Sequence, residues 1–182
     1  TYSYAIEDDN GGSVAQTATV TITGANDGPS VSSAVASTTS EDDGTYSVDL
    51  LEGASDPDTI DVLNIVGLTL TGGDDSGITV NGNSLDIDPN AYNSLAASES
   101  EIITYSYTIE DSNGGSVAQT ATITITGAND GPLVTGTVVS NATESSTAYS
   151  LDLLAGSDDP DTSDTLAVTG LTLTGGDDSG VS

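Results

Sequence analysis

The sequence predicts an all-β fold built from tandem two-layer sandwich domains that repeat every 103 residues. The first observation is the repeat itself, because Ala25-Asn-Asp-Gly-Pro29 returns unchanged at Ala128 to Pro132. Around it, Thr1 to Pro29 matches Thr104 to Pro132 with three substitutions. The second observation is that short alternating runs rich in Val, Ile, Leu, Thr and Tyr are separated by Gly, Asn and Asp, the pattern of strands and turns. A self-similar period of this length indicates an array of domains.

The period divides the chain into one complete unit and two partial ones. We expect residues 1–29 to hold the last strands of a preceding unit, residues 30–132 a complete sandwich, and residues 133–182 the front of a following unit. A unit of this length can bury a single core. Because the ends of the chain are out of phase with the units, we interpret it as a section of a longer array.

Each unit is expected to end in a long hairpin. Residues 1–6 and 13–23 alternate in polarity, and Glu7 to Gly12 supplies the turn. The second copy places its strands at 102–109 and 116–126, around the turn at 110–115. The Asn-Gly-Gly sequence inside both turns tolerates positive φ, as a hairpin turn requires.

The remaining elements of the complete unit follow from the same signals. Strands are predicted at 31–37, 45–51, 62–70, 78–80 and 85–87, with turns at 40–44, 72–77 and 81–83 and a loop at 52–59. Tyr46, Val48 and Leu50 should share one face of their strand. Residues 88–97 can hold one helical turn, with Tyr92 and Leu95 closing the bottom of the core. About seven short strands in roughly 100 residues are typical of an immunoglobulin-type sandwich.

Strand alternation in such a sandwich brings acidic loops together at each junction between units. Asp56, Asp58 and Asp111 should lie at the top of the complete unit. The bottom should carry Glu41, Asp88, Asn129 and Asp130, facing Asp159 and Asp161 of the following unit. Carboxylate and carbonyl oxygens from two units would therefore converge on each junction.

The charge balance restricts the partners of the chain. It contains no Lys, Arg or His against 29 Asp and Glu, so no salt bridge can form between its side chains. Nucleic acids are excluded as partners because phosphate binding depends on Lys and Arg, and direct contact with an anionic membrane is unfavourable. No stretch has the length of a transmembrane helix, and no signal peptide is visible.

The same composition argues against an enzyme and in favour of a metal. Without His, Cys or Lys there is no base-activated nucleophile. A carboxylate pair of the glycosidase kind is formally available, but the acidic motifs recur from unit to unit, which indicates a structural role. Cys is absent as well, so a metal is the reinforcement that remains for a domain of this size.

Calcium is the ion that these side chains favour. Ca²⁺ takes six to eight oxygen ligands and accepts irregular geometry, whereas zinc prefers His and Cys. Glu41 recurs as Glu144, while its neighbours Asp42 and Asp43 become Ser145 and Ser146, so the single Glu is the positional feature. The alternative is that these acids are solvated turn formers.

Three stretches carry a resemblance to a known family. Leu51 to Asp58, Glu110 to Ser116 and Thr122 to Pro132, with its strand followed by Asn-Asp-Gly-Pro, resemble the cadherin-like repeats, often called VCBS repeats, of giant bacterial RTX adhesins. The resemblance extends over the whole chain. It implies a rod of tandem sandwiches, stiffened by calcium at the joints, exported by type I secretion and displayed at the bacterial cell surface.

The resemblance also implies roles for individual residues. Asn129 and Asp130 would be linker ligands, Glu41 the ligand at the base of the first strand, and Asp159 with Asp161 the pair from the following unit. Asn26, Asp27, Asp56 and Asp58 would act in the same way at the preceding joint, and Glu144 corresponds to Glu41 in the next unit. The pattern departs from the family before the penultimate strand, where Asp86-Ile-Asp88-Pro89 stands in place of Asp-Arg-Glu.

The expected function is therefore mechanical. The chain would form part of an extracellular stalk whose partners are the neighbouring repeats of the same chain, and the adhesive ligand would bind elsewhere in the full-length protein. A calcium-dependent carbohydrate-binding module and a subunit of a self-assembling surface filament are the alternatives.

Overall fold

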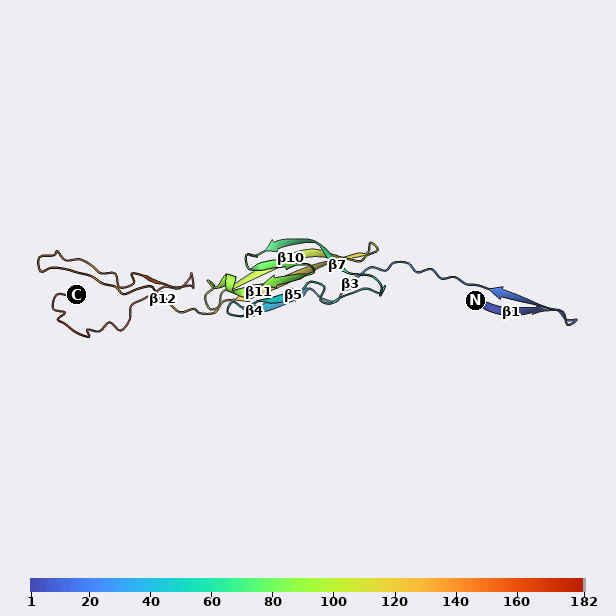
Figure 1. Cartoon of the computed structure of the whole chain (residues 1–182), viewed down its shortest axis with the longest axis horizontal. Helices are drawn as coiled ribbons and strands as arrows, with labels where there is room; N and C mark the ends of the chain where they lie inside the picture. Colours follow the sequence, from blue (N-terminus) through green and yellow to red (C-terminus); the bar gives the residue numbers. More distant parts are fainter. Residues whose placement is uncertain (182) are drawn as a thin grey trace.

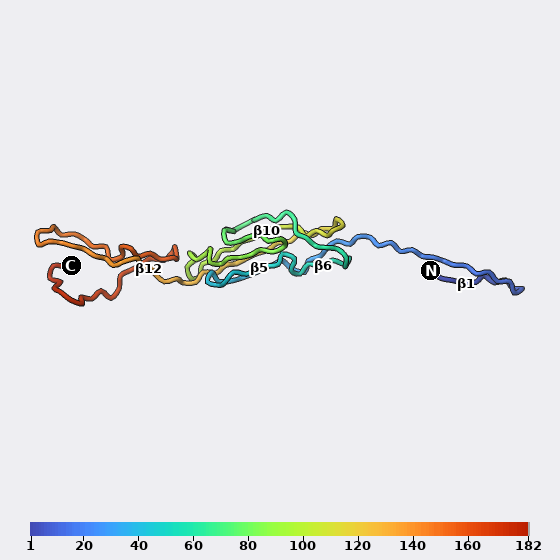
Figure 2. Tube along the Cα trace, viewed as in Figure 1, coloured from blue at the N-terminus to red at the C-terminus, as the bar shows by residue number. Residues whose placement is uncertain are grey.

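A central β-sandwich with an extended segment at each end makes the molecule long and thin in the computed structural model, which describes residues 1–181 (Figure 1). A hairpin of β1 (Tyr2–Glu7) and β2 (Ser13–Ala18) lies beyond one end of the sandwich, and residues 133–181 lie beyond the other (Figure 2). The sandwich contains β3 (Ser30–Val31), β4 (Val35–Ser40), β5 (Tyr46–Asp49), β6 (Ala54–Ser55), β7 (Asn64–Gly72), β8 (Ile78–Asn81), β9 (Ser84–Ile87), the 3-10 turn η1 (Pro89–Tyr92), β10 (Ser100–Glu110) and β11 (Ser116–Thr126). Two further short strands follow, β12 (Leu133–Val134) and β13 (Ser157–Asp158).

Two main sheets enclose the core of the sandwich. One has four strands in the order β4-β11-β10-β7, and the other has three in the order β5-β9-β8, with the short pair β3-β6 beside them. The fold is therefore all-β and sandwich-like, as the alternating runs and turn signals predict. Within residues 1–181, no helix is long and apolar enough to span a membrane.

The core forms because alternate residues of the strands face inward. Along β10, Ile103, Tyr105, Tyr107 and Ile109 are buried, while the residues between them are not. They pack against side chains of the opposite sheet: Val48, Leu50, Leu85 and Ile87. Full burial of each such aliphatic side chain stabilises the fold by about 1.5–3 kcal/mol. The Tyr107 hydroxyl donates to the Leu50 carbonyl at 2.7 Å, and burial raises the pKa of Tyr107 to about 12.

The first strand of the sandwich is divided between two sheets, which the alternation pattern does not predict. Ser30 and Val31 pair antiparallel with β6, whereas β4 runs parallel to β11. Hydrogen bonds fix the crossing, because the Ser32 amide donates to the Gly53 carbonyl at 3.0 Å and Gln119 Nε2 donates to the Ser33 carbonyl at 2.7 Å. The chain therefore leaves one sheet and joins the other within three residues.

Strand β7 forms an irregular edge of the four-stranded sheet. Its pairing with β10 shifts register between Thr104 and Tyr105 and again between Ser106 and Thr108. Gly67 lies in this region with a φ of +65°, a conformation that glycine adopts without steric cost. The shifts bend the strand at the edge of the sheet.

Segments on both sides of the sandwich repeat its local structure at an offset of 103 residues. Tyr2 pairs with Ala18 as Tyr105 pairs with Ala121. Similarly, β12 pairs with β13 in the register of β3 with β6. Most of their apolar side chains are exposed, as Leu153 is at 40%, whereas its counterpart Leu50 is fully buried.

Candidate metal centre

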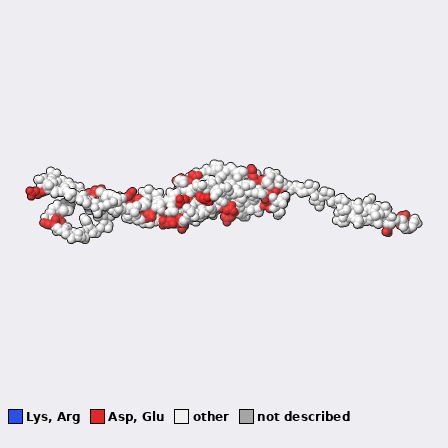
Figure 3. Space-filling model, viewed as in Figure 1, with Lys and Arg blue, Asp and Glu red and all other residues white. Residues whose placement is uncertain are grey.

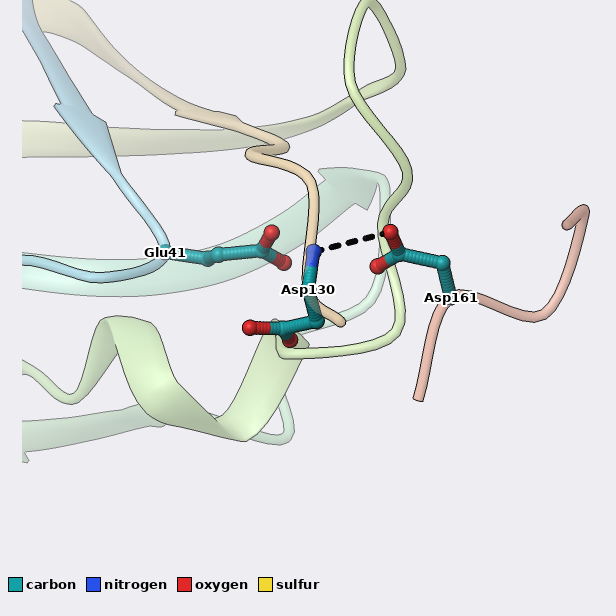
Figure 4. A group of neighbouring side chains, drawn as sticks. All are labelled: Glu41, Asp130 and Asp161. Atoms are coloured by element: carbon teal, nitrogen blue, oxygen red, sulfur yellow. Dashed lines mark hydrogen bonds between the residues drawn. The ribbon is translucent and has the colours of Figure 1, made fainter. Parts of the chain in front are cut away.

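Three carboxylates from three separate segments meet where β11 leaves the sandwich (Figure 4). Glu41 follows β4, Asp130 follows β11, and Asp161 belongs to the segment after β13. One carboxylate oxygen of each lies within 4.8 Å of the others. Glu41 is fully buried and Asp161 is 1% exposed. We call this group, with the residues that contact it, the C-terminal joint.

Backbone groups hold Glu41 in place. Its Oε1 accepts a hydrogen bond from the Ala128 amide at 2.7 Å, and its Oε2 accepts one from the Leu95 amide at 3.3 Å. The Glu41 amide itself donates to the Thr126 carbonyl at 3.0 Å. The carboxylate therefore connects the end of β4 to the segment that leaves β11 and to the loop after η1.

Asp130 and Asp161 connect the linker after β11 to the segment that follows β13. The Asp130 amide donates to Asp161 Oδ2 at 3.0 Å, and Asn93 Nδ2 donates to Asp130 Oδ2 at 2.6 Å. The Asp161 amide donates to Asp159 Oδ1 at 3.1 Å, which places Asp159 at the same joint. Beside it, the Thr162 amide and hydroxyl each donate to the Ser94 carbonyl at 3.3 Å.

The donor chemistry of this joint fits a hard divalent cation. Asp161 Oδ1 is buried and has no hydrogen-bond partner. At about 4 Å and an effective dielectric constant near 20, two carboxylates repel each other by roughly 4 kcal/mol, and the sequence has no basic side chain to offset this. Acidic side chains are visible over the sandwich and towards both ends of the molecule, while most of the arm that leads to the N-terminal hairpin has none (Figure 3). Carboxylate oxygens match Ca²⁺, and Glu41, Asp130 and Asp161 would hold it. Asp159 and Asp164 form a second close group that shares Asp161.

The preceding joint repeats the same contacts 103 residues earlier. The Asp27 amide donates to Asp58 Oδ2 at 2.7 Å, as Asp130 does to Asp161. The Asp58 amide donates to Asp56 Oδ1 at 2.8 Å, as Asp161 does to Asp159. Carboxylate oxygens of Asp56, Asp58 and Asp61 lie within 4.8 Å of one another, and Asp56 Oδ2 and Asp61 Oδ2 are buried without a partner. We call this group the N-terminal joint.

Asp111 completes the N-terminal joint from the turn of the last hairpin. Asn26 Nδ2 donates to Asp111 Oδ2 at 3.0 Å, and the amides of Asn113 and Gly115 donate to its Oδ1 at 2.8 Å. The hydrogen bond from Asn26, followed by those from the backbone amides, lowers the pKa of the Asp111 carboxyl below its ordinary value. Asp111 is thus an anion positioned by both the linker and its own turn.

Two of the sequence-predicted ligands, Asp88 and Glu144, lie outside these groups. Asp88 is exposed and belongs to none of the close acidic groups among residues 1–181. Glu144 is exposed and likewise belongs to none of the acidic groups found in the described part of the chain. Asn129, by contrast, contacts the C-terminal joint, since its Nδ2 donates to the Asp130 carbonyl at 2.8 Å.

The structure also brings in residues that the sequence reasoning missed. Asn93 contacts Asp130, and Asp61 accepts a hydrogen bond from Asn113 Nδ2 at 2.7 Å. Asp164 lies close to Asp159 and Asp161. Asp61 and Asp164 could have been found, since they occupy the same position in the repeated Asp-Pro-Asp-Thr-x-Asp loop. Asn93 has no second copy in this sequence and so carried no repeat signal.

A surface depression elsewhere on the sandwich does not compete with the joints. It has a volume of about 430 Å³, is open to solvent, and is lined by residues of β7, β10 and β11 that include Gly67, Ser106 and Thr120. None of its lining residues is acidic. The joints are therefore the chemically distinctive sites of the molecule.

The chain thus contains an all-β sandwich with a group of acidic side chains at each end. Residues 25–126, more than half of the chain, match the family model of the cadherin-like domain. The chain belongs to this family of cadherin-like domains.

Solved structures with a similar chain include the following one. It is a nucleoside hydrolase-related hypothetical protein from Saccharophagus degradans, described as associated with carbohydrate metabolism. The two sequences are 22% identical with a TM-score of 0.37, and the similarity covers 57% of this chain and 26% of that one. The comparison with curated proteins gave no match.

Proposed function

We propose that this chain is an extender segment in the stalk of a large, secreted bacterial surface adhesin. In this role tandem sandwiches of the VCBS type, in an adhesin of the RTX class, project a distal adhesive domain away from the cell. The units do no chemistry, and their partners are the neighbouring repeats of the same chain. Membership of the cadherin-like family supports an adhesion role outside the cell.

The observation that carries the proposal is the contact between units at the C-terminal joint. Asp130 on the linker and Asp161 on the following unit are joined by a 3.0 Å hydrogen bond beside the buried Glu41. Bound Ca²⁺ would supply the positive charge that this chain lacks. Glu41 then anchors the joint to the sandwich, Asp130 orients the linker, and Asp159 with Asp161 fix the following unit.

Charge explains why calcium would control stiffness. Without a cation, the carboxylates of adjacent units repel one another across each joint, and the linker is free to bend. With a cation shared between units, the same carboxylates hold both units in one orientation. A strand of about 10 residues at roughly 3.3 Å per residue spans about 33 Å. If the joints are stiff, each added unit therefore lengthens the stalk by about that distance.

Small-angle X-ray scattering of the full chain tests the proposal. We expect a larger maximum dimension and a narrower distance distribution in calcium than in chelator. Asp161→Asn should reduce this difference, because it removes a joint carboxylate. Asp42→Asn is the matched control, because Asp42 is an exposed acid beside Glu41 that lies outside the joint groups. An identical maximum dimension in calcium and in chelator would contradict the proposal.

A further inference from the structure

One broad surface of the sandwich lacks charged side chains: the outer face of the four-stranded sheet. Along β10, the residues between the buried ones point away from the core, and the register with β11 places their partners on the same side. These side chains are small and uncharged: Thr104 beside Thr122, Ser106 beside Thr120, and Thr108 beside Ala118. Thr38 of β4 and Thr69 of β7 continue the surface on its two sides. We call these residues, all at least partly exposed, the neutral face.

The neutral face is unusual in a chain of this charge. The formal net charge is −29, with no Lys, Arg or His to offset it. The outer face of the opposite sheet carries Asp49 on β5 and Asp86 on β9. Within β4, β7, β10 and β11 the acids are Glu101 and Glu110, which lie close to the two ends of β10. A second copy of the chain can therefore approach this face without the repulsion that opposes contact elsewhere.

This surface combines a protruding apolar side chain with a hollow. Ile102, near the start of β10, is 54% exposed and lies on the same side as the neutral face. The solvent-open depression of about 430 Å³ lies further along the strands, lined among others by Ser106 and Thr108 of β10 and by Ala118 and Thr120 of β11. The centre of this depression is about five residues, or about 17 Å, from Ile102.

The protrusion and the hollow are placed so that two copies of the face fit each other. The pair Thr104–Thr122 lies close to midway between Ile102 and the depression. A two-fold axis across the strands at this pair brings a second copy face to face, with its strands antiparallel. Each Ile102 then lies over the depression of the other copy. Contacts of this reciprocal kind are typical of two-fold symmetric dimers.

The area of the sheet suits a weak but specific contact. Strands about 4.8 Å apart, with about 3.4 Å per residue, give four strands of roughly eight residues an area of roughly 500 Å². Two copies would together bury roughly 1,000 Å², which is the lower limit for a specific interface. Depletion of charge is also what the buried centre of a protein interface shows.

We propose that the neutral face is a docking surface for a second copy of this chain, with Ile102 of each copy inserted into the depression of the other. This inference goes beyond the proposed stalk function, because it gives the side of the rod a binding partner. It assigns a role to an exposed side chain and to a depression that lie away from both joints.

Sedimentation equilibrium of the full chain in calcium, at high protein concentration, tests the proposal. The wild type should show a reversible monomer–dimer equilibrium. Ile102→Ala should lower the association constant by at least about tenfold, which corresponds to about 1.4 kcal/mol. Val80→Ala is the matched control, because Val80 is also 54% exposed but lies on β8 of the opposite sheet. Ala118→Leu should weaken association as well, because the larger side chain fills the depression.

Chemical cross-linking locates the contact independently of these variants. The sequence has no Cys, so a single introduced thiol reacts at a known place. Thr122→Cys lies beside the two-fold axis and faces its own copy, whereas Thr79→Cys lies on the outer side of β8, paired with Asp86. A short bis-maleimide should link Thr122→Cys into covalent dimers at least about tenfold faster than Thr79→Cys, because association raises the local concentration of the second thiol.

Three results would overturn the inference: a wild-type chain that stays monomeric, equal losses of association in Ile102→Ala and Val80→Ala, or equal cross-linking of the two cysteine variants. Thermal melts of Ile102→Ala and Ala118→Leu confirm that these variants are folded. Scattering separates this failure from that of the stalk proposal. A chain that extends in calcium but remains monomeric would keep the stalk function and leave the neutral face without a second copy.

Discussion

Asp161 combines burial, negative charge and an oxygen without a partner in one side chain. It is 1% exposed, its Oδ2 accepts the Asp130 amide, and its Oδ1 has no hydrogen bond. Unpaired buried carboxylates are costly. The simplest physical resolution is a cation that takes this free oxygen together with Glu41 and Asp130.

Replacing this one carboxylate by an amide should weaken calcium binding. Asp161→Asn keeps an acceptor for the Asp130 amide but removes a negative charge and a ligand oxygen, and calcium affinity depends on the number of charged ligands. We expect affinity at the C-terminal joint to fall by at least about tenfold, or about 1.4 kcal/mol, in isothermal titration calorimetry. Asp42→Asn, which changes the net charge equally, should leave the affinity nearly unchanged. Equal losses in the two variants would show that only overall charge matters.

The turn between β7 and β8 depends on a glycine that packs closely against β10. Gly73 has a φ of +84°, and a Cβ there would approach Ile103 Cα to 2.8 Å and also meet the Ile102 carbonyl. Gly82, in the turn between β8 and β9, has a φ of +60° but open space around it. The two glycines therefore separate backbone strain from steric overlap.

Alanine at these two positions should have unequal costs. Gly82→Ala is expected to lower the free energy of unfolding by about 1–2 kcal/mol, the cost of a left-handed conformation. Gly73→Ala should lower it by that amount and by a further 1–3 kcal/mol or so for overpacking. Urea unfolding at equilibrium, in calcium, measures both. Equal destabilisation would indicate that the contact with β10 relaxes freely.

At the scale of the secondary-structure elements, the sequence predicts the last hairpin but not the division of the first strand. The last hairpin was predicted closely, because eleven residues of β11 alternate without interruption and Asn113-Gly114 marks its turn. The division of the first strand was not predicted, because Ser32 and Ser33 fit either sheet and only their hydrogen bonds to Gly53 and Gln119 decide.

The residues of the candidate site were likewise predicted only in part. Glu41 and Asp161 were identified because each recurs after 103 residues at the same place in its loop. The loop before β10 was correctly expected at the C-terminal joint, but Asn93 contacts Asp130 there, while Asp88 is exposed. The 3-10 turn Pro89–Tyr92 separates these two residues. How such a turn rotates the residues that follow it is a property of packing that local pattern does not reveal.

At the scale of the whole molecule, no basic side chain offsets the repulsion between carboxylates. The formal charge is −29 and the sequence provides no Lys, Arg or His, so screening must come from the solvent. The Debye length shortens from about 10 Å at 0.1 M salt to about 3 Å at 1 M. Monovalent salt should therefore stabilise the chain wherever calcium does not.

Salt and calcium should consequently substitute for each other in part. In chelator, we expect the midpoint of thermal unfolding to rise as sodium chloride increases from about 0.1 M to 1 M. At saturating calcium the rise should be smaller, because the closest carboxylates are already neutralised. Circular dichroism melts at each condition measure this. A midpoint in chelator that ignores salt would mean that repulsion contributes little to stability.

The irregular β7 strand affects how closely packed copies of the chain interact at their sheet edges. Near-identical sandwiches held side by side present matching sheet edges, and unpaired edges are templates for aggregation between chains. The two register shifts in the pairing of β7 with β10 bend and twist this edge strand, and such irregularity disfavours pairing with a neighbouring edge. In the proposed stalk, this irregular edge should keep closely spaced rods from pairing edge to edge with one another, even where screening by ions has removed their mutual repulsion.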